Sequence, residues 1–542
     1  MRLPRALKLV LVALLFAGCS GEPQQAAAPP VVRAPAGPPV QGDALVVGSI
    51  GEPSNLIPIL SADSASSDIS GLVYNGLVRY DKNLNLEGEL AKSWEVSPDG
   101  LSITFHLRRG VKWHDGREFT SRDVLYTYRV TVDPKTPTAY SEDFKQVKTA
   151  QALDSYTFRV TYGKPFAPAL ASWGMPVLPA HLLEGKDITK SPLSRHPIGT
   201  GPFVFKEWIP GQKVTLERFP DYFEGAPHLA RYVYRIIPDN STMYMELKAG
   251  GIDMMGLSPV QYQRQTNNPE FLQRFNKYRY PASAYTYLGY NQRLPLFQDR
   301  RVRQAITCAI NKDEIIQGVL LGMGKIAHGP YKPGTWAYKP KVDADPGHDP
   351  ARAAALLKEA GYVMGSGGIL EKDGKPLSFT IMTNQGNDQR LKCAQIIQRR
   401  LKTVGIDVKI RVMEWASFLT NFIDKGKFDA VLLGWTISQD PDLYDVWHSS
   451  KTGPKELNFV GFKNAEVDRL IVEGRGTFDV EKRRACYYRI QEILAQEQPY
   501  TFLYVPDALP AVSARFRGIE PAPAGIMHNL IKWYVPKAEQ VN

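Results

Sequence analysis

Few residues in this chain of 542 have the types and spacing that catalysis needs. His114 and Asp115 follow Trp113 directly, and a histidine beside a carboxylate could exchange protons with a substrate. Asp115 also precedes Gly116, and Asp-Gly is typical of a tight turn between strands. We therefore expect a structural turn at this point rather than a general acid–base pair.

A second stretch looks like a phosphate-binding loop only superficially. Gly199, Thr200 and Gly201 form a Gly-x-Gly run, but no Lys-Ser/Thr pair follows it and Pro202 interrupts any helix start. No nucleophile with a neighbouring base is visible elsewhere in the sequence. We therefore expect a protein that is not an enzyme, with no catalytic residues and no cofactor.

Apart from Cys19 near the amino terminus, the chain has three cysteines, Cys308, Cys393 and Cys486, which lie far apart in helical patterns. Their odd number argues against a disulfide framework, and no Cys or His spacing matches a zinc site. We expect buried free thiols and no metal site. A single bridge between two of the three cysteines is the alternative.

The amino terminus has the features of an export signal. Arg2, Arg5 and Lys8 precede the apolar run 9–16, which is too short to span a bilayer, and small residues lead to Cys19. The run 15–19 resembles a bacterial lipobox, with Phe where Leu is commoner. We expect a signal peptide at residues 1–18 and lipidation of Cys19. An ordinary signal peptide with a bystander cysteine is the alternative.

Residues 19–42 are rich in Pro, Ala, Gly and Gln and show no apolar periodicity, which predicts an extended tether. Acyl chains on a cysteine at its start would anchor the protein to a membrane. The formal charge of the whole chain is +11, and the basic residues are spread along it rather than clustered. We therefore expect no nucleic-acid binding.

The pattern of apolar residues changes along the chain. The first half predicts strands at 44–50 and at 101–107, where apolar and polar residues alternate, and a helix capped by Thr120 and Asp123. The second half predicts helices and strands in turn: helices from Asp299, from Asn311 and over 388–404 and 479–496, and strands over 406–412 and 428–435. Residues 499–536 are again β-like. The chain therefore combines a β-rich first half with an α/β second half.

Four stretches, taken in order, resemble one known family. They are Leu90–Glu95 with Thr104–Gly116 and Phe119–Val124, then Pro197–Phe203, then Phe297–Ile306, and then Phe428–Trp435. Together they are similar to the extracellular solute-binding proteins of family 5, the dipeptide, oligopeptide and nickel type. The resemblance covers nearly all of residues 44–533.

The resemblance implies an α/β, two-lobe, periplasmic-binding-protein-like fold of type II, in the large class with an extra subdomain inserted in the first lobe. It places the first lobe at residues 43–79, 198–290 and 499–536, the inserted subdomain at 80–197, and the second lobe at 291–498. The lobes would swing about chain crossings near Asn291 and Gln498.

The resemblance also implies a function. We expect a lipid-anchored protein of the periplasm or cell exterior that captures peptides by closing its lobes. It would deliver them, as a monomer, to the permease and ATPase subunits of an ABC importer. Within the same transport role, a metal chelate, a sugar or another solute is an alternative ligand. A chaperone-like surface lipoprotein that binds peptides is a further alternative.

Site residues follow from the same likeness. In the peptide-binding relatives, the strand ending in Gly-Trp pairs its backbone with the peptide, which indicates Gly434, Trp435 and Thr436 here. The relatives then place an Asp that binds the ligand's amino terminus, and the first acids in this chain are Asp440 and Asp442. From the opposite lobe we expect Ala62, Asp63 and Ser64 in the loop 61–65, and at the hinge Asn291. A core position for Trp435 and a turn-capping role for the two acids are the alternatives.

Overall fold

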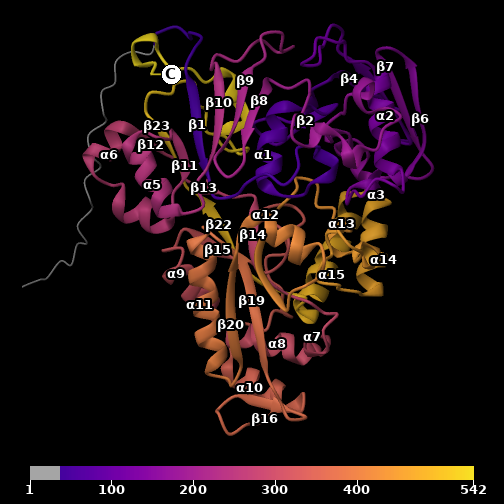
Figure 1. Ribbon diagram of the computed structural model, residues 1–542. Helices are drawn as coiled ribbons and strands as arrows, with labels where there is room; N and C mark the ends of the chain where they lie inside the picture. The colour runs from indigo at the N-terminus through magenta and orange to yellow at the C-terminus, as the bar shows by residue number, and fades with distance from the viewer. Residues whose placement is uncertain (1–36, 542) are drawn as a thin grey trace, which may run out of the picture. The chain divides into compact units, whose positions relative to one another are not determined.

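Residues 37–541 are described by a computed structural model (Figure 1). The expected signal peptide, Cys19 and residues 19–36 of the expected tether lie outside these residues. Within 37–541, the helices are too short or too polar to cross a bilayer. Two large sheets and a smaller four-stranded sheet organise this part of the chain.

The first large sheet takes strands from three separate parts of the sequence. Its order is β12-β23-β11-β1-β10-β9-β8. The strands are β1 (Ala44–Ser49), β8 (Phe203–Ile209), β9 (Lys213–Arg218), β10 (Arg231–Ile236), β11 (Met254–Gly256), β12 (Phe275–Lys277) and β23 (Pro510–Ser513). Strand β1 lies in the middle and runs parallel to β10.

The second large sheet has the order β13-β22-β14-β21-β19-β20, with β15 paired to β22. The strands are β13 (Tyr280–Pro281), β14 (Ala284–Tyr290), β15 (Gly324–Ile326), β19 (Ser378–Asn384), β20 (Asp407–Met413), β21 (Ala430–Thr436) and β22 (Tyr500–Ala508). Figure 1 shows this sheet below the first one.

The four-stranded sheet is antiparallel, in the order β4-β5-β7-β6. It consists of β4 (Ala91–Val96), β5 (Ser102–Leu107), β6 (Val147–Asp154) and β7 (Thr157–Tyr162). With helices α2 (Ser121–Val132) and α3 (Ser141–Lys145) it forms a unit that we call the four-stranded subdomain. The minor strands are β2 (Val78–Tyr80), β3 (Leu86–Gly88), β16 (Val363–Met364), β17 (Leu370–Lys372) and β18 (Lys375–Pro376).

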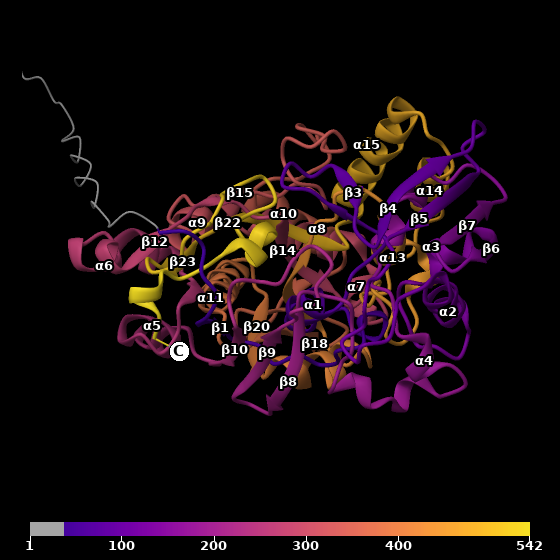
Figure 2. The ribbon, with the colours of Figure 1, turned by 90° about the horizontal axis from the view of Figure 1, so that it is seen from above.

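The remaining α-helices pack on or between the sheets. They are α1 (Ser64–Val73), α4 (Ala180–Leu183), α5 (Asn240–Ala249), α6 (Pro269–Arg274), α7 (Pro295–Gln298), α8 (Arg300–Ala309), α9 (Lys312–Gly318), α10 (Pro350–Glu359), α11 (Asp388–Lys402), α12 (Trp415–Phe418), α13 (Tyr444–Trp447), α14 (Ala465–Arg475) and α15 (Val480–Glu497). Helix α14 lies beside the four-stranded subdomain in both views (Figure 1, Figure 2).

Local sequence signals explain where these helices begin. The capping box of Thr120 and Asp123 is present at the start of α2. Asp299 caps α8 and Asn311 caps α9, as their positions predict. Side-chain oxygens at these positions accept hydrogen bonds from backbone N–H groups that have no partner inside the helix.

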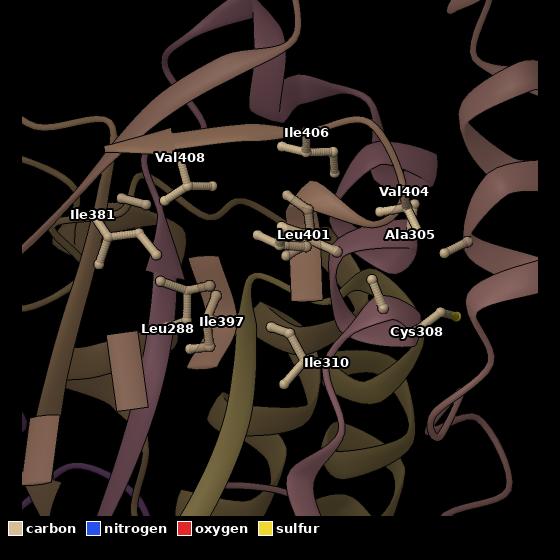
Figure 3. Packing of buried hydrophobic residues seen from close by; sticks show 14 of the residues in the cluster. Leu288, Ala305, Cys308, Ile310, Ile381, Ile397, Leu401, Val404, Ile406 and Val408 are labelled. Atoms are coloured by element: carbon tan, nitrogen blue, oxygen red, sulfur yellow. The ribbon is translucent and has the colours of Figure 1, made fainter. Parts of the chain in front are cut away.

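The second sheet is covered on both faces, as its apolar strand predicts. Along β21, Ala430 and Leu432 belong to one core cluster, and Val431 and Leu433 belong to another. Successive side chains of a strand point to opposite faces, so two apolar layers enclose the sheet. Figure 3 shows the first layer, in which Ile397 and Leu401 of α11 pack near Leu288 of β14.

The chain passes between the two large sheets at residues 277–280 and 508–510. These crossings differ from those expected near Asn291 and Gln498. Strands β14 and β22 pair with each other, and β14 also pairs with β21, so both strands belong to the second sheet rather than to the first lobe. The local sequence of these two strands carries no information on which sheet they join.

Candidate functional site

A cavity of about 1120 Å³ is lined by elements of both large sheets and of the four-stranded subdomain. From the first-sheet side come the end of β1 and the start of α1. From the second-sheet side come β14, the first turn of α11, the end of β21 and the loop that follows it. A cavity of this size, with polar and charged groups on an otherwise apolar wall, is typical of a ligand site.

Most of the residues expected at the site line this cavity. They are Ala62, Asp63, Ser64, Gly434, Trp435, Thr436, Asp440 and Asp442. Asn291 is not among the lining residues. Its amide instead donates hydrogen bonds to the carbonyl oxygens of Gly426 and Phe428, at 3.1 and 2.8 Å. Asn291 is 2% exposed, and its hydrogen bonds hold the turn before β21. The expected ligand contact of Asn291 is therefore replaced by a structural role.

The expected loop at 61–65 reaches the cavity, but Asp63 is committed to the protein. Its carboxylate accepts from the backbone N–H of Ser66 at 2.9 Å and from the hydroxyls of Ser54 and Ser66, at 2.5 and 2.7 Å. These bonds make Asp63 the N-cap of α1. Ala62 and Ser64 are exposed and have no such role.

Strand β21 has one open edge at the cavity. It pairs with β14 along its whole length, from Ala430 to Thr436. Its pairing with β19 includes only Ala430 and Val431. Beyond Val431, that edge of β21 is therefore left without a neighbouring strand among residues 37–541. An open strand edge can accept an extended chain through backbone hydrogen bonds.

Trp435 is half-buried at the end of this strand. Its indole N–H donates to the hydroxyl of Tyr500 at 3.3 Å, and its ring centroid lies 5.8 Å from that of Phe459. The indole is thus held by the second sheet while part of it faces the cavity.

Asp440 and Asp442 each pair with an arginine of the same side of the cavity. Nη2 of Arg483 lies 2.9 and 3.0 Å from the two oxygens of Asp440. Nε of Arg475 lies 3.0 Å from Asp442. Burial, with Asp143 and Asp440 nearby, raises the pKa of Asp442 to about 7 even though Arg475 lowers it.

The sequence did not indicate Arg390, which is a cation of the cavity wall without a carboxylate partner. It lies in the first turn of α11, where Asn387 caps the helix by accepting from the N–H of Arg390 at 2.9 Å. Its Nη1 atom donates to the side-chain oxygen of Asn384 at 2.8 Å. No ion pair joins Arg390 to an acid among residues 37–541, and burial lowers the pKa of the guanidinium. Asn387 is a typical N-cap residue, so the sequence can predict where this helix starts. It does not predict that the side chain of Arg390 lines the cavity.

Two further cations, Arg475 and Lys451, make contacts between the second-sheet side of the cavity and the four-stranded subdomain. Arg475 pairs with Asp143 of α3 and stacks on the rings of Phe166 and Tyr444, at 5.0 and 4.4 Å. Lys451 donates to the carbonyl oxygen of Ala139 at 2.8 Å. Both side chains are almost fully buried, so they form a clasp at one edge of the cavity.

The motifs that suggested other chemistry are structural. His114 contacts the carbonyl oxygen of Gly201 at 3.0 Å and accepts from the N–H of Gly199, and burial lowers its pKa to about 4. Cys308, Cys393 and Cys486 are buried free thiols. In the part of the chain that the structure describes, no group of three or more His, Cys, Asp and Glu side chains is arranged to hold a metal ion.

Comparisons with known proteins agree with this architecture. The family model of the bacterial extracellular solute-binding proteins, family 5, matches residues 85–456. The oligopeptide-binding protein AppA of Bacillus subtilis is 36% identical over 543 residues, which covers 98% of each chain.

Solved structures of this family superpose on nearly the whole chain. AppA from Bacillus subtilis in complex with a nonapeptide has a TM-score of 0.87 and 36% identity, and covers 92% of this chain and 100% of its own. NikZ from Campylobacter jejuni in complex with Ni(L-His) has a TM-score of 0.83 and 28% identity, and covers 91% and 99%. The fold is the two-lobe periplasmic-binding-protein fold, and the chain belongs to the bacterial extracellular solute-binding proteins of family 5.

Proposed function

We propose that this chain captures a peptide in the cavity of about 1120 Å³ and delivers it to the permease of an ABC importer. The observation that carries the peptide assignment is the open edge of β21, which has no strand partner on the β19 side beyond Val431 within the described residues. A peptide added to this edge would gain backbone hydrogen bonds that do not depend on its side chains. The likeness to AppA, whose solved complex holds a nonapeptide, supports the same ligand class.

Arg390 supports a ligand with a carboxylate. The described residues give its guanidinium no carboxylate partner, so its charge in the cavity is poorly compensated, and a bound carboxylate would supply the missing charge. The start of α11 adds the partial positive charge of a helix amino terminus at the same place. We assign this position to the carboxyl terminus of the peptide.

The experiment is a backbone N-methyl scan of a peptide that binds, followed by calorimetry. In an antiparallel pair, alternate residues exchange hydrogen bonds with the neighbouring strand. Each methylation of a paired N–H should weaken binding about 2- to 10-fold, and methylations between these positions should have less effect. A scan without a two-residue period would contradict addition to β21.

A metal chelate is the second candidate, because the NikZ structure that superposes on this chain holds Ni(L-His). Native mass spectrometry of protein purified from the source bacterium separates the two. A peptide mass distribution supports the first proposal. A single added mass that contains a metal supports the second.

We also propose that Cys19, which lies outside the described residues, anchors the protein to the membrane through acyl chains. The sequence of residues 9–19 supports this, as does the low-complexity segment that follows. Cys19→Ala should move the protein from the membrane fraction to the soluble fraction. Retention of the variant on the membrane would overturn the anchor.

Closure of the two lobes is the proposed mechanism of capture. A ligand moves an open–closed equilibrium only through its difference in affinity for the two states. A shift from 1:99 to 99:1 takes about 5.5 kcal/mol. Small-angle scattering should show a smaller radius of gyration with saturating ligand, and an unchanged curve would contradict closure.

A further inference from the structure

The acids that line the cavity differ in what compensates their charge. Most of them have a partner in the protein. Hydroxyl and backbone donors satisfy Asp63, Arg475 pairs with Asp143 and Asp442, Arg483 pairs with Asp440, and Lys451 lies 3.4 Å from Asp445 and 2.6 Å from Glu456. The protein itself thus neutralises much of the negative charge on the second-sheet side of the cavity.

Asp68 is the exception on the first-sheet side. It lies in α1, on the same helical face as Ser64 and Ser67, and all three residues line the cavity. Among residues 37–541, no hydrogen bond or ion pair is made by its carboxylate. Asp68 has a large accessible surface, but it is surrounded by protein. This burial is the main cause that raises its pKa to about 6, and the negative charge of Asp63 is the second cause. The exposed part of Asp68 therefore faces the cavity rather than the outer surface of the protein.

Within the part of the chain that the structure describes, the neighbours of Asp68 offer no positive charge. Tyr232 and Tyr234 of β10 are buried, and the negative charge of Asp68 contributes to the raised pKa of both phenols. Tyr234 already donates its hydroxyl hydrogen to Ser49 at 2.6 Å. Asp63 adds a second negative charge. An ionised carboxylate in such surroundings destabilises the empty protein unless something in the cavity neutralises it.

We infer that Asp68 binds a cationic group of the ligand, an ammonium or guanidinium, and so selects ligands that carry one. This inference rests on the proposed function, since it concerns the same cavity. Arg390 on the second-sheet side would then bind a negative group of the ligand, and Asp68 on the first-sheet side would bind a positive group of the same ligand. The cation can come from the amino terminus of a peptide or from a Lys or Arg side chain.

The test measures binding of four peptides to the parent protein and to Asp68→Asn. The peptides share one sequence and differ in having a free or acetylated amino terminus and a Lys or norleucine side chain. A charge-assisted hydrogen bond predicts that Asp68→Asn weakens the cationic form about 10- to 100-fold and leaves the matching neutral form nearly unchanged. The peptide pair that shows this difference identifies the source of the cation.

Asp424→Asn is the matched control. Asp424 also lines the cavity, but Lys455 and Lys425 lower its pKa against the burial that raises it. Its removal should leave the selectivity unchanged. If both variants lose selectivity equally, a diffuse negative field rather than Asp68 is responsible, and the inference is overturned. It is also overturned if Asp68→Asn binds all four peptides as the parent does.

A second measurement needs no ligand. Because the pKa of Asp68 is raised in the folded protein, its ionisation costs stability above about pH 6. Asp68→Asn should therefore melt at a higher temperature than the parent at pH 8, and at a similar temperature at pH 4. A lower melting temperature at pH 8 would show that the carboxylate has a stabilising partner and would overturn the inference. Failure of the parent to bind any of the four peptides would instead contradict the proposed peptide function.

Discussion

A Cβ atom on Gly434 would lie 2.9 Å from Nη2 of Arg390, so the absence of a side chain on β21 leaves room for the guanidinium. The same Cβ would lie 2.8 Å from the carbonyl oxygen of Tyr285 in β14. The glycine is therefore required by the close approach of its neighbours. Gly434 thus allows Arg390, at the start of α11, to lie against the open end of β21.

Arg390→Gln should weaken binding of peptides that have a free carboxyl terminus. The expected loss is about 10- to 100-fold, because a hydrogen bond to a charged group is lost. Peptides with an amidated carboxyl terminus should bind the variant and the parent alike. Calorimetry with the two peptide forms measures both effects.

Arg399→Gln is the control for this prediction. Arg399 lies in the same helix but pairs with Glu314 on the surface, with 65% of its side chain exposed. Its removal should leave both peptide forms unaffected. Equal losses for free and amidated peptides in Arg390→Gln would contradict the assignment of the carboxylate to this position.

Asp440→Asn should reduce stability, because it leaves the guanidinium of Arg483 without its carboxylate. The two side chains are 18% and 10% exposed, and breaking such a buried pair typically costs about 3–5 kcal/mol. The double variant Asp440→Asn with Arg483→Gln should recover part of the loss, since neither charge is then left alone. Denaturant unfolding of the parent, both single variants and the double variant measures the coupling.

The role expected for Asp440 from the family likeness is a separate question that the same variants answer. If Asp440 binds the ligand's amino terminus, the double variant should lose affinity for free-amine peptides and keep its affinity for N-acetylated ones. Equal affinities for both forms in parent and variant would leave Asp440 as the partner of Arg483 alone.

The difference between Asp440 and Arg483 shows how far the sequence predicts the site. The sequence indicates Asp440 and Asp442 because they follow the distinctive Gly434-Trp435 pair closely in the chain. Arg483 lies 43 residues later in a helix with charged residues on several faces, so nothing local predicts that it turns inward. The same holds for Arg390, Arg475 and Asp68, whose importance depends on which groups the fold leaves without partners.

The fold was predicted where the signal is local. Alternation over 101–107 and the apolar run 428–435 identify β5 and β21 because burial on one or both faces determines those patterns. The sheet to which a strand belongs is set by long-range pairing. The assignment of β14 and β22 to the second sheet therefore needed the structure.

Arg475→Gln should loosen the clasp between α14 and the four-stranded subdomain. The arginine pairs with Asp143 on one side and with Asp442 on the other, and only 5% of its side chain is exposed. Its loss leaves two buried acids without their cation, so closed arrangements of the lobes should become less populated. Scattering from the ligand-free variant should give a larger radius of gyration than the parent.

The exposed pair of Arg469 and Glu473 in the same helix supplies the control. Arg469→Gln should leave the scattering curve unchanged, because an exposed i,i+4 pair contributes little. Identical curves for the parent and Arg475→Gln would mean that the clasp does not hold the two parts together.

Two buried acids of the cavity, Asp442 and Asp445, should contribute a loss of stability to the ligand-free protein as the pH rises from about 4 to about 8. Burial and nearby acids raise the pKa of Asp442 to about 7 and that of Asp445 to about 8. Unfolding restores an ordinary value, near 3.8, so between these limits the folded state holds more protons than the unfolded state. The contribution of these two acids is then full below about pH 4 and decreases as they ionise, by up to about 1.4 kcal/mol per pH unit for each proton.

Asp445→Asn should flatten this dependence and raise the melting temperature at pH 8. One of its carboxylate oxygens is buried and makes no hydrogen bond, with only the ammonium of Lys451 at 3.4 Å. Lys451 also pairs with Glu456 at 2.6 Å, so the substitution should leave Lys451 a carboxylate partner. Asp343→Asn is the control, because that side chain is 83% exposed and should leave the profile unchanged. Calorimetric melting of the three proteins from pH 4 to 9 tests this directly. If Asp445→Asn melts below the parent at pH 8, the ionised carboxylate stabilises the clasp through Lys451, and the burial of Asp445 does not explain its effect.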